Sequence, residues 1–167
     1  MAIDCFISFA EERPEKSTAS VPKGNPRTPW KDRAEIQAWS FGVKSPYDSI
    51  AALPPGQRRH FPITIRKEID KSTPLLFKAF LSKEPLACKI ELFKAGTGGF
   101  GVRPNFTAEL SGGLISSIKH VTATQGQTHS GIRPTSGLEE IQFTYEKIDV
   151  TWNDGGITAQ DDWESRV

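Results

Sequence analysis

The feature that most constrains this chain is a change of pattern within residues 60–81, HFPITIRKEIDKSTPLLFKAFL. In the first half, apolar residues recur with the two-residue period of a strand that has one buried face. In the second half almost every residue is apolar and that period is lost. The chain therefore passes from a half-buried strand to a short apolar helix within a few residues. The apolar residues of the strand pattern are Phe61, Ile63, Ile65 and Ile69.

The residues at the start of the helix indicate where it begins. Thr73 can accept hydrogen bonds from the first free helical amides, and Pro74 can occupy the first helical position, where its missing N–H costs nothing. We expect the helix to end near Ser82, before Pro85. Only Lys78 is charged among its first eight residues, so no face of the helix is suited to water. A small β domain covers one side only, and we expect a second copy of the chain to cover part of the rest.

Length and charge exclude several classes of protein. A chain of 167 residues fits one domain, and we expect a single domain over residues 1–167. Its 21 Lys and Arg residues nearly balance 20 Asp and Glu, so no bulk charge favours nucleic acid or anionic lipid as a partner. No apolar run approaches the ~18 residues of a membrane span, and MAIDCFISF lacks the basic start and long apolar core of a secretory signal. We therefore expect a cytoplasmic protein without membrane insertion.

Alternating apolar residues predict further strands along the chain. The first begins at Ile3, and a second follows within residues 35–44, where Trp39, Phe41 and Val43 share one face. No rhythm of alternating strands and helices is present, which argues against a parallel sheet. Three further extended segments begin at Ala87, Phe106 and Leu138.

These elements indicate a mainly all-β fold. We expect an antiparallel β-barrel of two packed sheets with one short α-helix at about residues 74–82. Two long loops, residues 11–34 and 44–59, and a flexible acidic tail, residues 153–167, complete the chain. Cys5 and Cys88 each lie on the apolar phase of a predicted strand, so we expect two reduced core thiols rather than a disulfide.

Two breaks in the strand pattern predict bends. Gly112 and Gly113 interrupt the segment after Phe106, which is therefore two strands or one bent strand. The apolar residues before and after Glu146 and Lys147 are out of phase with each other. A bulge or bend near these two residues restores burial on both sides.

One signature in the sequence resembles a catalytic motif, the GxGxxG of Gly96, Gly98 and Gly101. The dinucleotide-binding form needs a following helix, but Pro104 leads into a strand, so a glycine-rich hairpin loop is the better interpretation. The histidines show no spacing typical of a metal site on one element. We expect no enzyme activity, no cofactor and no metal. The histidines are His60, His120 and His129.

Apolar residues in a loop and in the tail are candidates for contact with other chains. The loop 44–59 is too apolar for an idle connection, and Pro54 and Pro55 restrict its backbone. The tail 153–167 has one large aromatic residue whose indole can dock against a neighbour. Together with the helix, these segments supply the candidates for contact between subunits, which are Tyr47, Ile50, Leu53, Leu75, Phe77 and Trp163.

Four motifs resemble a known family. IRKEIDKSTPLLFKAF, GLEEIQFTYEKIDVTW, the earlier WSFGV and the terminal DDWE look like the haemolysin-coregulated protein (Hcp) family, the inner-tube protein of the bacterial type VI secretion system. The resemblance covers nearly the whole chain in the right order, and the four motifs together are specific. Residues 11–34 depart from the family, because this segment is longer and richer in proline than the short turn expected there.

The resemblance implies a structural function. Members of the family form a β-barrel with one helix and assemble into homohexameric rings, which stack into a tube inside a contractile sheath. The tube carries a spike at its tip and leaves the cell without a signal peptide, and effector proteins bind in its lumen. Because the chain ends just after the tube motifs, we expect a bare tube subunit that is cytoplasmic before firing and secreted afterwards.

A second class of protein is compatible with this size and strand content. It is a monomeric β-barrel that carries a small ligand in its interior. The apolar helix and the aliphatic residues 50–53 count against this class, because both need protein partners. The mass in solution separates the two, since the carrier predicts one chain and the tube several.

Overall fold

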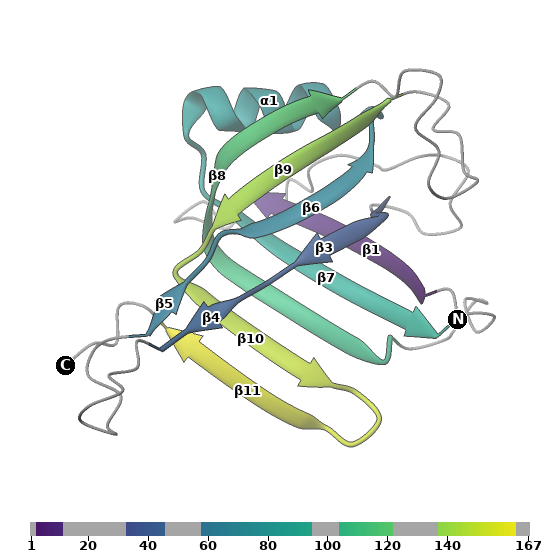
Figure 1. Cartoon of the computed structure of the whole chain (residues 1–167), viewed down its shortest axis with the longest axis vertical. Helices are drawn as coiled ribbons and strands as arrows, with labels where there is room; N and C mark the ends of the chain where they lie inside the picture. The colour runs from purple at the N-terminus through teal and green to yellow at the C-terminus, as the bar shows by residue number, and fades with distance from the viewer. Residues whose placement is uncertain (1–2, 12–32, 46–57, 95–103, 122–136, 163–167) are drawn as a thin grey trace.

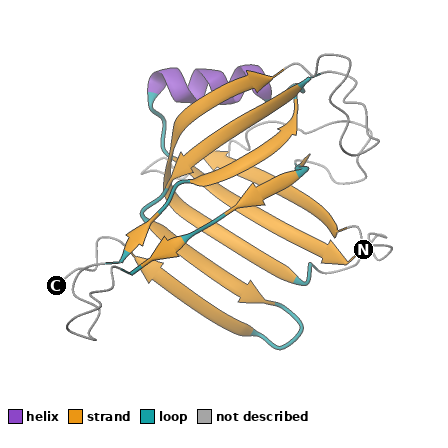
Figure 2. Cartoon of the chain, viewed as in Figure 1, coloured by secondary structure: helices purple, strands orange, loops and turns teal. Residues whose placement is uncertain are grey.

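The computed structural model describes residues 3–11, 33–45, 58–94, 104–121 and 137–162. In these ranges eleven strands and one helix form two crossing layers of sheet with the helix at one end, as Figures 1 and 2 show. The strands are β1 (Ile3–Glu11), β2 (Ala34–Glu35), β3 (Ala38–Ser40), β4 (Val43–Lys44), β5 (Arg59–His60), β6 (Ile63–Glu68), β7 (Leu86–Lys94), β8 (Phe106–Val121), β9 (Leu138–Thr144), β10 (Lys147–Trp152) and β11 (Ile157–Asp162), and the helix is α1 (Thr73–Ser82).

Strand β8 belongs to both layers (Figure 1). Its first part pairs with β7 and β10, and its second part pairs with β9, all antiparallel. The bend lies at Gly112, which has a φ of 62°, a conformation that glycine adopts without steric cost. A Cβ on the next residue, Gly113, would lie 2.5 Å from the carbonyl oxygen of Leu86 on β7. Of the two outcomes predicted for this segment, the structure has the single bent strand.

Two consecutive residues close the barrel between β2 and β3. The backbone N–H of Ile36 donates to the carbonyl of Cys5 on β1 (2.9 Å), and that of Gln37 donates to the carbonyl of Arg66 on β6 (2.8 Å). One short segment therefore joins the edges of both layers, and the order β2-β1-β7-β8-β9-β6-β3 begins and ends with strands that are neighbours in the sequence. Closure of this kind satisfies edge amides that would otherwise be unpaired.

The core lies between the two layers and consists mainly of aliphatic and aromatic side chains from β1, β6, β7, β8 and β9. Cys5 and Cys88 are both buried there as free thiols, which confirms their predicted state. Burial raises the pKa of the Cys5 thiol to about 12, against the opposing effect of a hydrogen bond from the backbone of Phe6. Within the described ranges, no helix has the length and apolar character needed to span a membrane.

The predicted change of phase near Glu146 and Lys147 is confirmed. Strand β9 ends at Thr144, and the chain turns at Tyr145 and Glu146 before β10 begins. The turn moves the chain from one layer to the other, because β9 pairs with β6 and β8 whereas β10 pairs with β8 and β11. Tyr145 and Ile148, on either side of the turn, are both buried.

Some expectations about strands were wrong. The chain leaves strand geometry between β3 and β4, so Phe41 and Val43 are exposed and only Trp39 packs against the core. Phe61 is half-exposed, because β6 begins only at Ile63. Within the tail expected to be flexible, residues 153–167, the described part instead turns and forms β11, which pairs with β10 along its length, and residues 163–167 lie outside the described ranges.

Candidate interaction surfaces

The start of α1 is bonded to the preceding turn and to the sheet. Thr73 is the first residue of the helix rather than its cap, and the cap is Ser72, which makes no capping bond with its side chain. The hydroxyl of Thr73 accepts from the backbone N–H of Asp70 (3.1 Å) and donates to Glu139 on β9 (2.9 Å). The predicted capping role of Thr73 is therefore wrong, because this side chain bonds to the preceding turn and to the sheet.

A buried charge cluster joins this turn to the sheet. Lys67 and Glu139 are both 1% exposed, and the Lys67 Nζ lies 2.6 Å from Glu139 Oε1 and 2.8 Å from Asp70 Oδ1. His120 Nε2 lies 3.3 Å from the other oxygen of Glu139. Burial alone would raise the pKa of Asp70, but the hydrogen bonds from Lys67 and Ser72 outweigh it and hold this pKa below its ordinary value. The cluster ties the start of α1 to β6 and β9.

The outward side of α1 is apolar. Leu76 and Ala79 are buried against the barrel, whereas Leu75, Phe77 and Leu81 are 45%, 47% and 65% exposed. The prediction that this chain leaves part of the apolar helix surface uncovered is confirmed. Exposed aliphatic and aromatic residues gathered on one helix are typical of a protein contact surface.

The long loop after β4 starts and ends on a small hairpin. Val43 of β4 pairs with His60 of β5, and the N–H of Phe61 donates to the carbonyl of Gly42 (2.9 Å). Of the candidate contact residues, Leu75 and Phe77 lie on α1 and are exposed, and their contact with another subunit stays a prediction. The others, Tyr47, Ile50, Leu53 and Trp163, lie outside the described residues.

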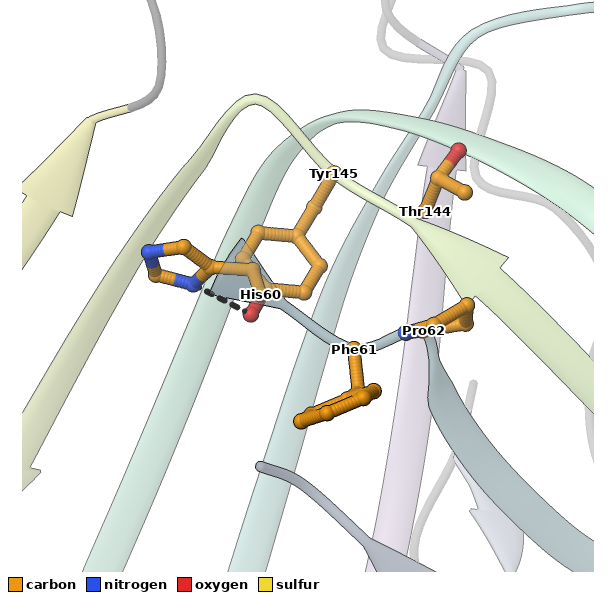
Figure 3. Close-up of a pocket in the computed structure, with 5 residues that line it drawn as sticks. All are labelled: His60, Phe61, Pro62, Thr144 and Tyr145. Carbon is orange, nitrogen blue, oxygen red and sulfur yellow. Dashed lines mark hydrogen bonds between the residues drawn. The ribbon is translucent and has the colours of Figure 1, made fainter. Parts of the chain in front are cut away.

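A network of hydrogen bonds holds the base of the β4–β5 hairpin against the rest of the barrel, and Figure 3 shows part of it. His60 Nδ1 lies 2.7 Å from the hydroxyl of Tyr145, and its Nε2 lies 2.8 Å from Asp161 Oδ2 on β11. Arg58 donates to the second oxygen of Asp161 (2.9 Å). Burial and the negative charge of Asp161 raise the pKa of Tyr145 to about 12, so this phenol stays protonated at neutral pH. This network links β5, the turn after β9, and β11.

A shallow cavity of about 280 Å³ lies beside these residues, lined by His60, Phe61, Pro62, Thr144 and Tyr145. Its volume is just below the 300–1,000 Å³ typical of small-molecule sites, and its lining is mostly apolar. The His60 and Tyr145 side chains bond to each other, so their polar atoms are already satisfied. The cavity therefore suits an apolar side chain better than a polar ligand.

The other predicted features carry no site. Gly96, Gly98, Gly101 and His129 lie outside the described residues, and the chain after the glycines continues as strand β8, not as the helix that dinucleotide binding needs. Among the described residues, no group of three or more His, Cys, Asp or Glu side chains is placed to hold a metal ion.

Comparison with known proteins identifies the family. The family model described as "Type VI secretion system effector, Hcp" matches residues 17–152. The chain belongs to the Hcp family. The match confirms the resemblance seen in the sequence. The Hcp family is structural and non-enzymatic. The match begins inside the segment 11–34 that departs from the family pattern.

Individual Hcp relatives agree with this assignment. A "Major exported protein" from Pseudomonas aeruginosa is 34% identical over 140 residues, which cover 81% of this chain and 78% of the relative. The crystal structure of an Hcp protein has a TM-score of 0.80 at 24% identity and covers 98% of this chain and 99% of its own. The secreted protein Hcp3 from P. aeruginosa has a TM-score of 0.71 at 24% identity, covering 98% and 100%. These two likenesses show the Hcp fold, which confirms the mainly β architecture with one short helix.

Proposed function

We propose that this chain is the inner-tube subunit of a type VI secretion system. Six copies form a ring, rings stack into a tube inside a contractile sheath with a spike at the tip, and effector proteins are carried in the lumen. The observation that carries this proposal, beside membership of the Hcp family, is the uncovered apolar side of α1 with Leu75, Phe77 and Leu81. An isolated chain leaves this surface in water, whereas an assembly buries it.

The barrel is suited to ring formation because it is closed and uneven. A ring needs a heterologous contact, in which one patch of each copy meets a different patch of the next. The helix at one end and the two hairpins, β4–β5 and β10–β11, give the molecule several distinct patches (Figure 1). We propose further contacts at Tyr47, Ile50, Leu53 and Trp163. The first three lie in the loop between β4 and β5, and we propose that they contact the next ring in the stack.

Export by the type VI machinery is the proposed route out of the cell. The Pseudomonas relative is called a major exported protein, and Hcp3 is called a secreted protein. On this proposal the chain is cytoplasmic until the sheath contracts. It is then expelled with the tube and its cargo.

The mass of the assembly tests the proposal. We expect native mass spectrometry at micromolar concentration to give a hexamer, and negative-stain electron microscopy to show rings. A monomer as the sole species would contradict the proposal and favour a monomeric ligand carrier. Replacing Leu75, Phe77 and Leu81 with Ser removes the apolar side of α1, and Lys78→Ser is the matched control on the same helix. The triple variant should lose assembly or export while the control keeps both.

The loop between β4 and β5 is tested separately. Shortening residues 47–55 to a Gly-Ser turn should leave rings intact but weaken stacking and export. Each buried aliphatic residue that is lost should cost about 1.5–3 kcal/mol at its contact, repeated around the ring. Size-exclusion chromatography with electron microscopy distinguishes the outcomes. Normal stacking excludes the loop as a stacking element, and a fall to monomer assigns it to the contact within a ring.

A further inference from the structure

The turn of the β10–β11 hairpin presents two apolar side chains to solvent. Trp152 and Ile157 face each other in the strand register and are 45% and 70% exposed. Two large apolar residues at a hairpin end, left this exposed by the described parts of their own chain, are costly unless another surface receives them. We call this pair the knob.

The knob is held rigidly by the start of β8. The side-chain amide of Asn153 donates to the carbonyl of Pro104 (2.7 Å) and to the hydroxyl of Thr107 (2.9 Å), and its backbone N–H donates to the carbonyl of Asn105 (2.9 Å). The side-chain amide of Asn105 in turn donates to Asp154 (3.0 Å). A tip fixed in this way loses little conformational freedom when it binds, which favours affinity.

The cavity beside His60 and Tyr145 has the size and character to receive such a knob. Its volume of about 280 Å³ is of the order of one large side chain, and its mutually bonded polar atoms leave an apolar lining. Figure 3 shows Phe61 and Pro62 on one side of it and Thr144 and Tyr145 on the other. The bond from His60 to Asp161 on β11 holds the His60 side of this lining in place.

Charges around the two surfaces are complementary. Asp154 lies at the turn next to the knob. Arg59 lies next to His60 and is exposed, as is Arg58, whose guanidinium bonds to Asp161. Opposite charges at the rim of an apolar contact favour one orientation of two molecules over others.

The knob and the cavity of one chain cannot meet. Asp161, which bonds to His60 at the cavity, and Ile157 in the knob are four residues apart on the same strand. A strand rises by about 3.3 Å per residue, so the two surfaces are separated by roughly 13 Å of paired backbone. A second copy of the chain is the partner that carries the complementary surface.

We propose that the knob of Trp152 and Ile157 inserts into the cavity of His60, Phe61, Pro62, Thr144 and Tyr145 on a second copy of this chain. The contact is heterologous, so each copy offers its knob to one neighbour and its cavity to another. The proposal rests on the self-association proposed above and specifies one contact through which it occurs.

Cross-linking between two differently tagged copies tests the contact. One copy carries Ile157→Cys and the other Thr144→Cys, and the two are co-expressed, purified and exposed to a mild thiol oxidant. Both positions are exposed, and the native thiols Cys5 and Cys88 are buried. We expect a disulfide between copies that carry different tags, and little disulfide between copies that carry the same tag. The control replaces Thr144→Cys with Val121→Cys, an exposed residue at the other end of the β8–β9 ladder, and should give no cross-link.

The same samples separate failure of this contact from failure of the proposed function. If native mass spectrometry shows the assembled protein without the mixed disulfide, or with as much in the Val121 control, the contact is wrong and the tube proposal stands. If wild-type protein is monomeric, both fail. As an independent test, Ile157→Asp should weaken association about tenfold to hundredfold, whereas Ile157→Leu should not change it. Wild-type association of Ile157→Asp would overturn the contact.

Discussion

Two regions around α1 invert the usual distribution of residues. Beneath the start of the helix, Lys67 on β6 and Glu139 on β9 are charged and almost fully buried, whereas on the outer side of the helix Leu75, Phe77 and Leu81 are apolar and exposed. The inner charges have partners within the chain, so they position the helix. The outer apolar residues are left to solvent by the single chain. The comparison teaches that the buried charges of this junction serve the fold, whereas its exposed apolar residues do not and are the surface that we propose for assembly.

The largest expected effect on stability comes from breaking the buried charge cluster beneath the start of α1. Lys67→Met leaves the buried carboxylate of Glu139 and the partly buried carboxylate of Asp70 without their ammonium partner. Removal of one member of a buried ion pair typically costs about 3–5 kcal/mol, so we expect a loss of this size in the free energy of unfolding measured with urea. The double variant Lys67→Met with Glu139→Gln should recover much of it. A single variant within about 1 kcal/mol of wild type would mean that the cluster does not position the helix.

A smaller effect is expected from the hydroxyl that joins the helix to the cluster. Thr73→Val keeps the shape of the side chain but removes its bonds to Asp70 and Glu139. We expect a loss of about 1–3 kcal/mol, measured in the same urea titration. Ser82→Ala, at the exposed end of α1, is the control and should change stability by less than about 0.5 kcal/mol. Equal losses in the two variants would refute a special role for Thr73.

The buried thiol predicts how the interior responds to alkaline pH. The pKa of Cys5 is raised by burial from 9.0 to about 12, so the unfolded chain ionises this thiol first. Its stabilising contribution is complete below pH 9 and is lost as the pH rises toward 12. We expect the urea midpoint to fall between pH 9 and 11, and to fall less steeply in Cys5→Ala. Rapid labelling of Cys5 by a thiol reagent in the native protein at pH 8 would contradict its burial.

The smallest effect on stability is expected on the outer side. Serine at Leu75, Phe77 and Leu81 removes apolar surface that the folded chain already exposes, so the dissociated subunit should change by about 0.5 kcal/mol or less. Urea unfolding of dilute, dissociated protein measures this change, with circular dichroism as the check that α1 persists. A loss of several kcal/mol would place these residues in the core of the subunit and remove the contrast between the two sides.

Sequence patterns predicted the fold better than the surfaces. Apolar periodicity identified α1, the bend in β8 and the turn near Glu146, because burial imposes its period directly on the residues. The same reasoning missed Lys67, although the strand period places it on the buried phase between Ile65 and Ile69, and this was the signal available. A lysine on a buried phase indicates a hidden partner, but the partner Glu139 is 72 residues away and no local pattern connects them.

The exposed aromatic residues were the other difficulty. Phe61 and Phe41 share the period of buried neighbours and were expected to lie inside, and Trp152 is in phase with the buried Ile148. Each lies where a strand begins, breaks or ends, and the period of a strand does not say where the strand stops. The cavity beside His60 joins residues that are 85 positions apart, so it could not be predicted from local sequence.

The continuous backbone of β8 couples the two layers of the barrel mechanically. In a barrel built from two separate sheets, a push on one layer can slide it past the other, resisted only by side-chain contacts. Here the same strand runs through both layers, so sliding requires β8 to separate from β7 and β10 in one layer or from β9 in the other. A force on one layer is therefore transmitted to the other through the covalent backbone of β8, across the bend at Gly112.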